Sequence, residues 1–119
     1  MKMFDINRTI EEIKNSSNID NLGMILMHNG IVRATSKDGR KISFMELDYD
    51  EKKLKELVEY ANKQSFVEKC VVWINKGKLN IGDDIMFVVL AGTDRKRLLP
   101  LFEEIIEKLK KEIVKEIER

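Results

Sequence analysis

The sequence predicts an α+β fold with a mixed or antiparallel sheet and flanking helices. The length of 119 residues suits one hydrophobic core, so we expect residues 1–119 to form a single domain. Short apolar runs bounded by turn residues are typical of strands, and stretches with apolar residues three and four apart are typical of amphipathic helices. Because helices and groups of strands alternate along the chain, a layered arrangement is favoured over a barrel.

The first half of the chain predicts a short helix and two strands. A Thr-x-x-Glu capping box predicts a helix over residues 9–14. An apolar run over residues 24–33 predicts a strand, and Gly30 within it predicts a bulge or bend. The Lys-Asp-Gly segment at residues 37–39 predicts a turn into a second strand over residues 42–47. We expect these two strands to pair.

The second half predicts a helix, three strands and a long final helix. The helical period over residues 50–64 predicts the first of these helices. Three apolar runs predict strands over residues 70–74, 79–81 and 85–90. The last run is continuously apolar, which predicts burial on both faces. The final helix is predicted from about residue 94 to the chain end, and Pro100 implies either a start nearer Arg97 or a kink.

Composition excludes several classes of function. With 22 basic and 21 acidic residues, the chain has no bulk attraction for nucleic acid or anionic lipid. The single cysteine, Cys70, is interpreted as a buried hydrophobe and favours a reducing compartment. The absence of a signal segment or long apolar run then predicts a cytoplasmic protein. One cysteine and one histidine predict no metal site, and His28 is interpreted as half-buried and hydrogen-bonded.

A basic segment lies at the predicted start of the final helix. Residues 95–97 are Arg-Lys-Arg, and they follow Thr93 and Asp94. Free backbone N–H groups and the helix dipole favour an anion at such a position, and a bound anion would offset the added cations. The alternative is a capped helix start with solvated charges.

Lys110 lies 15 residues after Arg95, which is about 22 Å along a straight helix. One small ligand could reach both side chains only if a second copy of the chain supplied one of them. This spacing predicts a symmetric dimer if both residues serve one site. The alternative is that Lys110 is one of several solvated lysines near the chain end.

Three sequence blocks, in this order, resemble the large, catalytic subunit of molybdopterin synthase. The first is Gly23, an apolar run and then Gly-Ile-Val-Arg ending at Arg33. The second is Gly-Lys-Leu at residues 77–79 followed by Ile-Gly-Asp, and the third leads from Thr-Asp-Arg, ending at Arg95, to Leu-Lys, ending at Lys110. The resemblance covers about residues 23–115 and implies the hammerhead-like fold of that subunit.

The resemblance also implies a reaction, partners and site residues. Members of that family convert cyclic pyranopterin monophosphate to molybdopterin in molybdenum cofactor biosynthesis, without a cofactor of their own. The sulfur arrives as a thiocarboxylate on the C-terminal Gly-Gly of a small ubiquitin-like subunit, and the large subunit is a homodimer within a heterotetramer. By position, Arg33, Asp94, Arg95 and Lys110 would bind substrate, and Lys110 and Lys115 would be catalytic.

Departures from the family pattern leave more than one function open. Asp94 stands where the family has histidine, and Lys115 matches the second family lysine only if two residues are deleted; the ungapped match is Ile117. The family's C-terminal tail has no counterpart after Arg119. The alternatives are an active sulfur-inserting subunit, a noncatalytic dimeric binding module for a ubiquitin-like partner, and a helical interaction module that uses the final apolar stripe.

Overall fold

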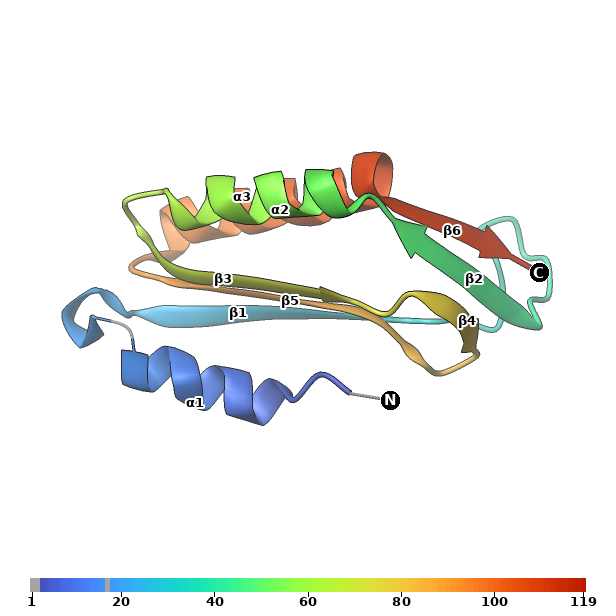
Figure 1. The fold of residues 1–119 in the computed structure, drawn as a ribbon, viewed down its shortest axis with the longest axis horizontal. Helices are drawn as coiled ribbons and strands as arrows, with labels where there is room; N and C mark the ends of the chain where they lie inside the picture. Colours follow the sequence, from blue (N-terminus) through green and yellow to red (C-terminus); the bar gives the residue numbers. More distant parts are fainter. Residues whose placement is uncertain (1–2, 17) are drawn as a thin grey trace.

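The computed structural model describes residues 3–16 and 18–119. It contains two antiparallel three-stranded sheets, with strand orders β1-β5-β3 and β4-β2-β6. The long sheet consists of β1 (Met24–Ile31), β5 (Asp84–Gly92) and β3 (Val67–Ile74), and the small sheet of β4 (Gly77–Asn80), β2 (Phe44–Tyr49) and β6 (Val114–Glu118). The small sheet lies at one end of a molecule that measures 47 × 26 × 26 Å (Figure 1). The predicted α+β class is confirmed.

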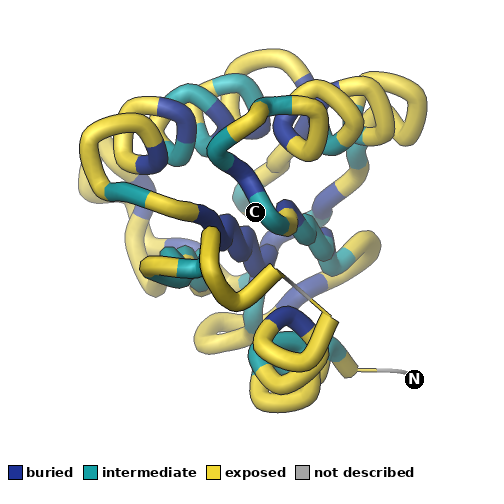
Figure 2. Tube along the Cα trace, turned by 90° about the vertical axis from the view of Figure 1, so that its left-hand side faces the viewer, coloured by how far each residue is buried: buried dark blue, intermediate teal, exposed yellow. Residues whose placement is uncertain are grey.

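Helices cover both faces of the long sheet. α2 (Glu51–Asn62) and α3 (Arg95–Lys108) lie on one face, and α1 (Ile6–Ser16) lies on the other (Figure 1). A short 3-10 turn, η1 (Ile19–Asn21), follows α1. Every residue of the central strand from Ile85 to Ala91 is buried, so the predicted burial on both faces is confirmed. Figure 2 shows the buried residues concentrated between the sheets and the covering helices.

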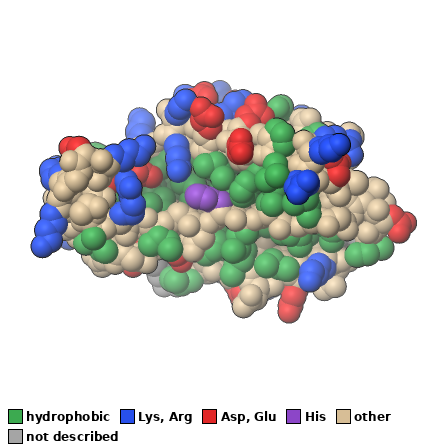
Figure 3. Space-filling model, turned by 180° about the vertical axis from the view of Figure 1, so that it is seen from behind, with side chains coloured by type: hydrophobic (Ala, Val, Ile, Leu, Met, Phe, Trp, Pro, Cys, Tyr) green, Lys and Arg blue, Asp and Glu red, His purple; other side chains and the backbone are tan. Residues whose placement is uncertain are grey.

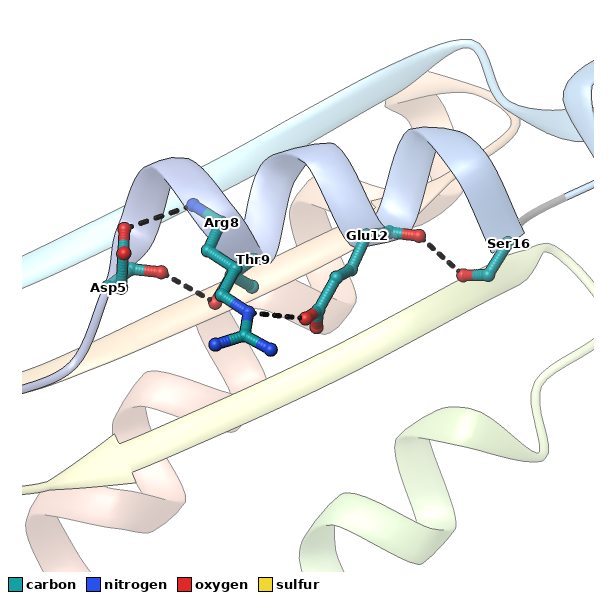
Figure 4. Close-up of polar contacts among 5 residues, drawn as sticks. All are labelled: Asp5, Arg8, Thr9, Glu12 and Ser16. Carbon is teal, nitrogen blue, oxygen red and sulfur yellow. Dashed lines mark hydrogen bonds and ion pairs between the residues drawn. The ribbon is translucent and has the colours of Figure 1, made fainter.

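The first helix is longer than predicted and has a different cap. Its first turn is closed by Asp5, whose Oδ1 accepts the backbone N–H of Arg8 at 3.0 Å (Figure 4). Thr9 lies inside the helix and donates its hydroxyl to the carbonyl of Asp5, while Glu12 forms an ion pair with Arg8. The capping box assigned to Thr9 and Glu12 is therefore wrong, because an aspartate four residues earlier supplies the cap.

The predicted bulge and turn are confirmed, but the predicted strand pairing is wrong. The register of β1 against β5 shifts between Gly30 and Ile31, and Gly39 adopts a φ of 86° in the turn. Beyond the turn only an isolated bridge joins Thr35 to Lys41. Residues 32–43 cross from the long sheet to the small sheet. As a result, β1 pairs with β5, whereas β2 pairs with β4 and β6.

The end of the chain also differs from the prediction. α3 begins at Arg95, not near Arg97, and contains Pro100 within it. It ends at Lys108, a π-helical turn (Leu109–Ile113) follows, and the remaining residues form β6 beside β2. The apolar residues after the π turn are Val114 and Ile117, which are both β-branched. Their spacing suggested one continuous helix, but β-branched side chains suit a strand equally well.

Candidate functional site

A groove of about 590 Å³ lies between β1, the π turn and β6. Its charged side chains are Arg33, Lys37, Lys110, Glu116 and Glu118, and its floor includes His28, Met45, Ile85 and Met86. Figure 3 shows basic side chains gathered at the end of this face, beside the histidine and a surrounding apolar area. The structure thus brings together two predicted site residues, Arg33 and Lys110.

The π turn presents Lys110 to the groove. Leu109 and Ile113 are buried and anchor the turn, whereas Lys110 between them is exposed. The next residue, Lys111, forms an ion pair with Glu107 at 2.6 Å. Among the described residues, Lys110 has no ion-pair partner within 4 Å, and the same holds for Arg33 and Lys37 in the groove. Three cations therefore remain free to bind an anion, and π turns frequently occur at functional sites.

Backbone hydrogen bonds fix the position of Arg33. The preceding residue, Val32, is buried; its N–H donates to the carbonyl of Asp83 and its carbonyl accepts the N–H of Gly82, both at 2.9 Å. Gly82 adopts a φ of 92°, which a residue with a Cβ rarely tolerates. The hairpin between β4 and β5 therefore holds the end of β1 and places Arg33 at the rim of the groove.

Glu116 is a groove residue that the sequence analysis missed. It lies opposite Leu47 in the pairing of β6 with β2, and strand alternation puts it on the same face as Glu118. Partial burial and the negative charge of Glu118 raise its pKa, and Lys110, Lys37 and Arg33 oppose this shift. A strand prediction for the last residues would have revealed the two glutamates on one face.

His28 lies in the floor of the groove as a neutral imidazole. Burial lowers its pKa below the usual value, and the charge of Lys110 lowers it further. The side chain is half-buried as predicted, but its Nε2 atom is buried and has no hydrogen-bond partner among the described residues. The prediction of a hydrogen-bonded histidine therefore fails at this nitrogen.

Lys115 does not line this groove. It is paired with Asp48 across the two strands of the small sheet, and its positive charge helps to lower the pKa of that carboxyl, after a backbone hydrogen bond and Lys76. Alternation along β6 puts Lys115 on the face opposite Glu116. Its catalytic role stays a prediction, and the ungapped alternative, Ile117, shares its face.

The start of α3 lies far from the groove. α3 runs along the molecule, with its first residue at one end and the π turn near the small sheet at the other (Figure 1). Asp94 is the N-cap: its carboxylate accepts the backbone N–H of Arg97 at 3.2 Å and the Nε–H of the same residue at 2.7 Å. The side-chain hydrogen bond from Arg97 lowers the pKa of Asp94. Arg95 opens α3 and Lys110 lies in the π turn after its other end, so one chain does not bring the two side chains together.

Other chemical features of the described chain are few. Cys70 is buried, and burial raises the pKa of its thiol to about 12, which leaves it a poor nucleophile. Within residues 3–16 and 18–119 no three His, Cys, Asp or Glu side chains gather to hold a metal ion. No helix in this part of the chain has the length and apolar content needed to cross a membrane.

Comparisons with known proteins match this chain over most of its length. The model of a family described as MoaE protein matches residues 2–112. A curated protein of Methanocaldococcus jannaschii, named uncharacterized protein MJ0717, is 33% identical over 93 residues, which is 75% of this chain and 78% of the relative.

Two solved structures are similar in fold. Molybdopterin synthase from Staphylococcus aureus has a TM-score of 0.78 at 20% identity, over 100% of this chain and 87% of the other. A complex of subunits 1 and 2 of molybdopterin-converting factor from Helicobacter pylori has a TM-score of 0.72 at 22% identity, over 97% and 78% of the two chains. The fold resemblance therefore extends over the whole described chain.

Proposed function

Because the chain belongs to the MoaE protein family, we propose that it inserts sulfur into cyclic pyranopterin monophosphate to give molybdopterin, with the sulfur donated by a thiocarboxylated small subunit. The observation that carries the proposal is the joint placement of Arg33 and Lys110 in one groove, where neither has an ion-pair partner among the described residues. Cations kept unpaired beside an apolar floor are suited to a ligand that has both a phosphate and a heterocycle.

The groove residues suit the chemistry of sulfur transfer. The nucleophile is the sulfur of the small subunit, so this chain need only hold the phosphate, orient the thiocarboxylate and stabilise developing negative charge. Arg33 and Lys37 at the rim would hold the phosphate. Lys110 would contact the reacting atoms, because it projects from the π turn beside the neutral His28.

We propose a homodimer in which Arg95 of a second copy completes each groove. Support comes from the position of Arg95 at the start of α3, while Lys110 lies in the π turn after its other end, and from exposed apolar side chains on β1 and α3. Ile31 on β1 is 50% exposed and Leu99 on α3 is 38% exposed. The outer edge of β1 is unpaired in the long sheet, and edges of this kind are usually covered.

The proposed partner is a small ubiquitin-like subunit whose C-terminal tail enters the groove. The Helicobacter pylori structure is a complex of two subunits of molybdopterin-converting factor, which is the kind of assembly we propose for this chain. The open groove beside Lys110 would admit an extended tail. A free buried thiol at Cys70 is compatible with the cytoplasm as the place of this assembly.

A noncatalytic binding module is the second candidate. Asp94 places a carboxylate beside Arg95, and Lys115 lies outside the groove of its own chain. Both observations favour a protein that binds the small subunit without turnover.

Reconstitution separates the two candidates. The purified chain is incubated with thiocarboxylated small subunit and cyclic pyranopterin monophosphate, and molybdopterin is measured. We expect Lys110→Gln to lower turnover by about 10²- to 10⁴-fold, whereas the matched control Lys111→Gln, which removes only an exposed ion pair with Glu107, should stay within about twofold. A wild-type chain that binds the small subunit but forms no product would support the binding module.

A further inference from the structure

We propose that Glu116 is the general base that activates water to release the small subunit after sulfur transfer. The inference rests on the proposed sulfur-inserting function and assigns a step of it to a residue of this chain. Glu116 lies in the same groove as Lys110 and Arg33. Its place there follows from β6, the strand that forms one wall of the groove.

The wall that carries Glu116 is held at both ends. At its start, Val114 and the preceding Ile113 are buried, and the carbonyl of Ile113 accepts the N–H of Asp50 at 3.0 Å. At its end, Arg40 donates to the carbonyl of Glu118, and the N–H of Arg119 donates to the carbonyl of Phe44 at 2.9 Å. The backbone that carries Glu116 therefore has a fixed place, which helps to position a general base.

The charges around Glu116 suit a proton acceptor. Burial and Glu118 raise its pKa and so bring it closer to neutral pH, where a general base is most effective. Lys110, Lys37 and Arg33 act in the opposite direction and favour the ionised form that accepts a proton. Glu116 remains solvent-accessible, so water can reach its carboxylate.

His28 is less suited to the same task. Its pKa is lowered by burial and by Lys110, which weakens it as a base. Its Nε2 atom is buried beneath the groove surface and is out of contact with solvent. Glu118 shares the groove but has its main-chain carbonyl tied to Arg40 at the strand end. The charges of Lys110, Lys37 and Arg33 act on Glu116, and we therefore assign this step to Glu116.

The step balances without a further reagent. The step starts from the small subunit joined to the pterin intermediate through a thioester between its terminal glycine and the transferred sulfur, and it covers only the hydrolysis of that thioester. Water then adds to the carbonyl carbon of the terminal glycine, forming a C–O bond, and Glu116 takes the proton that water loses. The C–S bond breaks with its electron pair on sulfur. The small subunit leaves with a carboxyl terminus, and the proton held by Glu116 returns to the product thiolate or to solvent.

A single-turnover experiment tests this assignment. The chain, the thiocarboxylated small subunit and cyclic pyranopterin monophosphate are mixed and quenched, and the small subunit is analysed by mass spectrometry for a hydroxylamine-sensitive pterin adduct. We expect Glu116→Gln to accumulate the adduct and to slow its hydrolysis by about 10²- to 10⁴-fold. The control Glu46→Gln removes a carboxylate from the same sheet, where it forms an exposed ion pair with Arg119, and should hydrolyse the adduct at the wild-type rate.

The pH profile provides the second measurement. A general base acts in its ionised form, so the wild-type rate of adduct hydrolysis should fall as the pH decreases through the raised pKa of Glu116. Glu116→Gln should lose this acidic limb while the unfolding temperature, followed by Trp73 fluorescence, stays near that of the wild type. The inference is wrong if Glu116→Gln hydrolyses the adduct at the wild-type rate and keeps the acidic limb. It is also wrong if the substitution slows formation of the adduct and not its hydrolysis. Either result leaves the proposed function standing. Absence of adduct and product in the wild type would refute the proposed function itself.

Discussion

The two ends of α3 carry similar charges but use them differently. Beside its C-terminal end, Lys110 projects into a groove with Arg33, and both are free of ion pairs among the described residues. At its N-terminal end, Asp94 caps the helix and holds Arg97 at 2.7 Å, while Arg95 is left exposed. One end of the helix therefore contributes to a concave binding site, whereas the other end presents a charge outward. Each end is suited to be one part of a site shared between two chains.

Mixing two inactive variants is the strongest test of this division. If Lys110 and Arg95 of different chains meet in one site, Lys110→Ala and Arg95→Ala homodimers should each be almost inactive. A heterodimer of the two variants has one site with both residues intact, so random mixing should restore about a quarter of the wild-type activity per chain. The measurement is molybdopterin formation after the two variants are unfolded and refolded together.

The control for mixing is the double variant. Refolding Lys110→Ala with a chain that carries both substitutions leaves no intact site and should give no recovery. If the mixed single variants form dimers but also stay inactive, Lys110 and Arg95 of different chains do not share a site. The two residues then act in separate sites or within one chain.

Arg33→Ala should raise the KM for the pterin substrate by about 10- to 100-fold, because a hydrogen bond to a charged group contributes about 1.5–3 kcal/mol. Arg8→Ala is the matched control, since Arg8 forms an exposed ion pair with Glu12 on α1 and does not line the groove. Steady-state kinetics at constant ionic strength would measure both effects. Equal KM values for the two variants would mean that the phosphate binds elsewhere.

Asp94→Asn addresses the opposite end of α3. Asparagine retains the N-cap, so the helix start should persist while the negative charge beside Arg95 is lost. A like charge about 4 Å away costs about 1 kcal/mol in water, so loss of this repulsion should lower the KM for the substrate by about two- to fivefold. Asp94→Ala, which removes the cap as well, should instead lower the unfolding temperature. A KM unaffected by Asp94→Asn would place this helix start outside the site.

Most of the fold was predictable because its signals are local. The π turn and β6 could not be predicted, because the apolar residues at positions 109, 113, 114 and 117 also fit one face of a helix. These last residues form a strand because they pair with β2, which is a tertiary contact. The glycines of the resemblance have structural reasons that sequence alone did not give. A Cβ on Gly23 would lie 2.1 Å from the carbonyl oxygen of Thr93, so only glycine permits the close contact between β1 and the chain before α3.

The candidate site was predicted in part. Arg33 and Lys110 were found by their position in the family pattern, and the structure puts them in one groove. Glu116 was missed because the assumed helix put it on a solvated face, whereas strand alternation turns it into the groove. Arg95 opens α3 and Lys110 lies in the π turn after the end of that helix. The predicted separation of about 22 Å assumed one continuous α-helix, and the π turn changes the last part of that span.

The smallest expected effect concerns the electrostatic repulsion between Lys110 and the protonated form of His28. Through this repulsion the π turn influences the floor of the groove. His28 is the only histidine, so its imidazole gives one NMR signal that can be followed through a pH titration. Lys110→Gln should raise the pKa of His28, since the ammonium charge disfavours the imidazolium, while burial should still hold it below the usual value. Arg95→Gln should leave this pKa unchanged in an isolated chain, because Arg95 lies at the far end of α3. In the dimer the same substitution should raise the pKa of His28 if the Arg95 of the second chain enters the groove, so one titration reports whether the two ends of α3 meet across the interface.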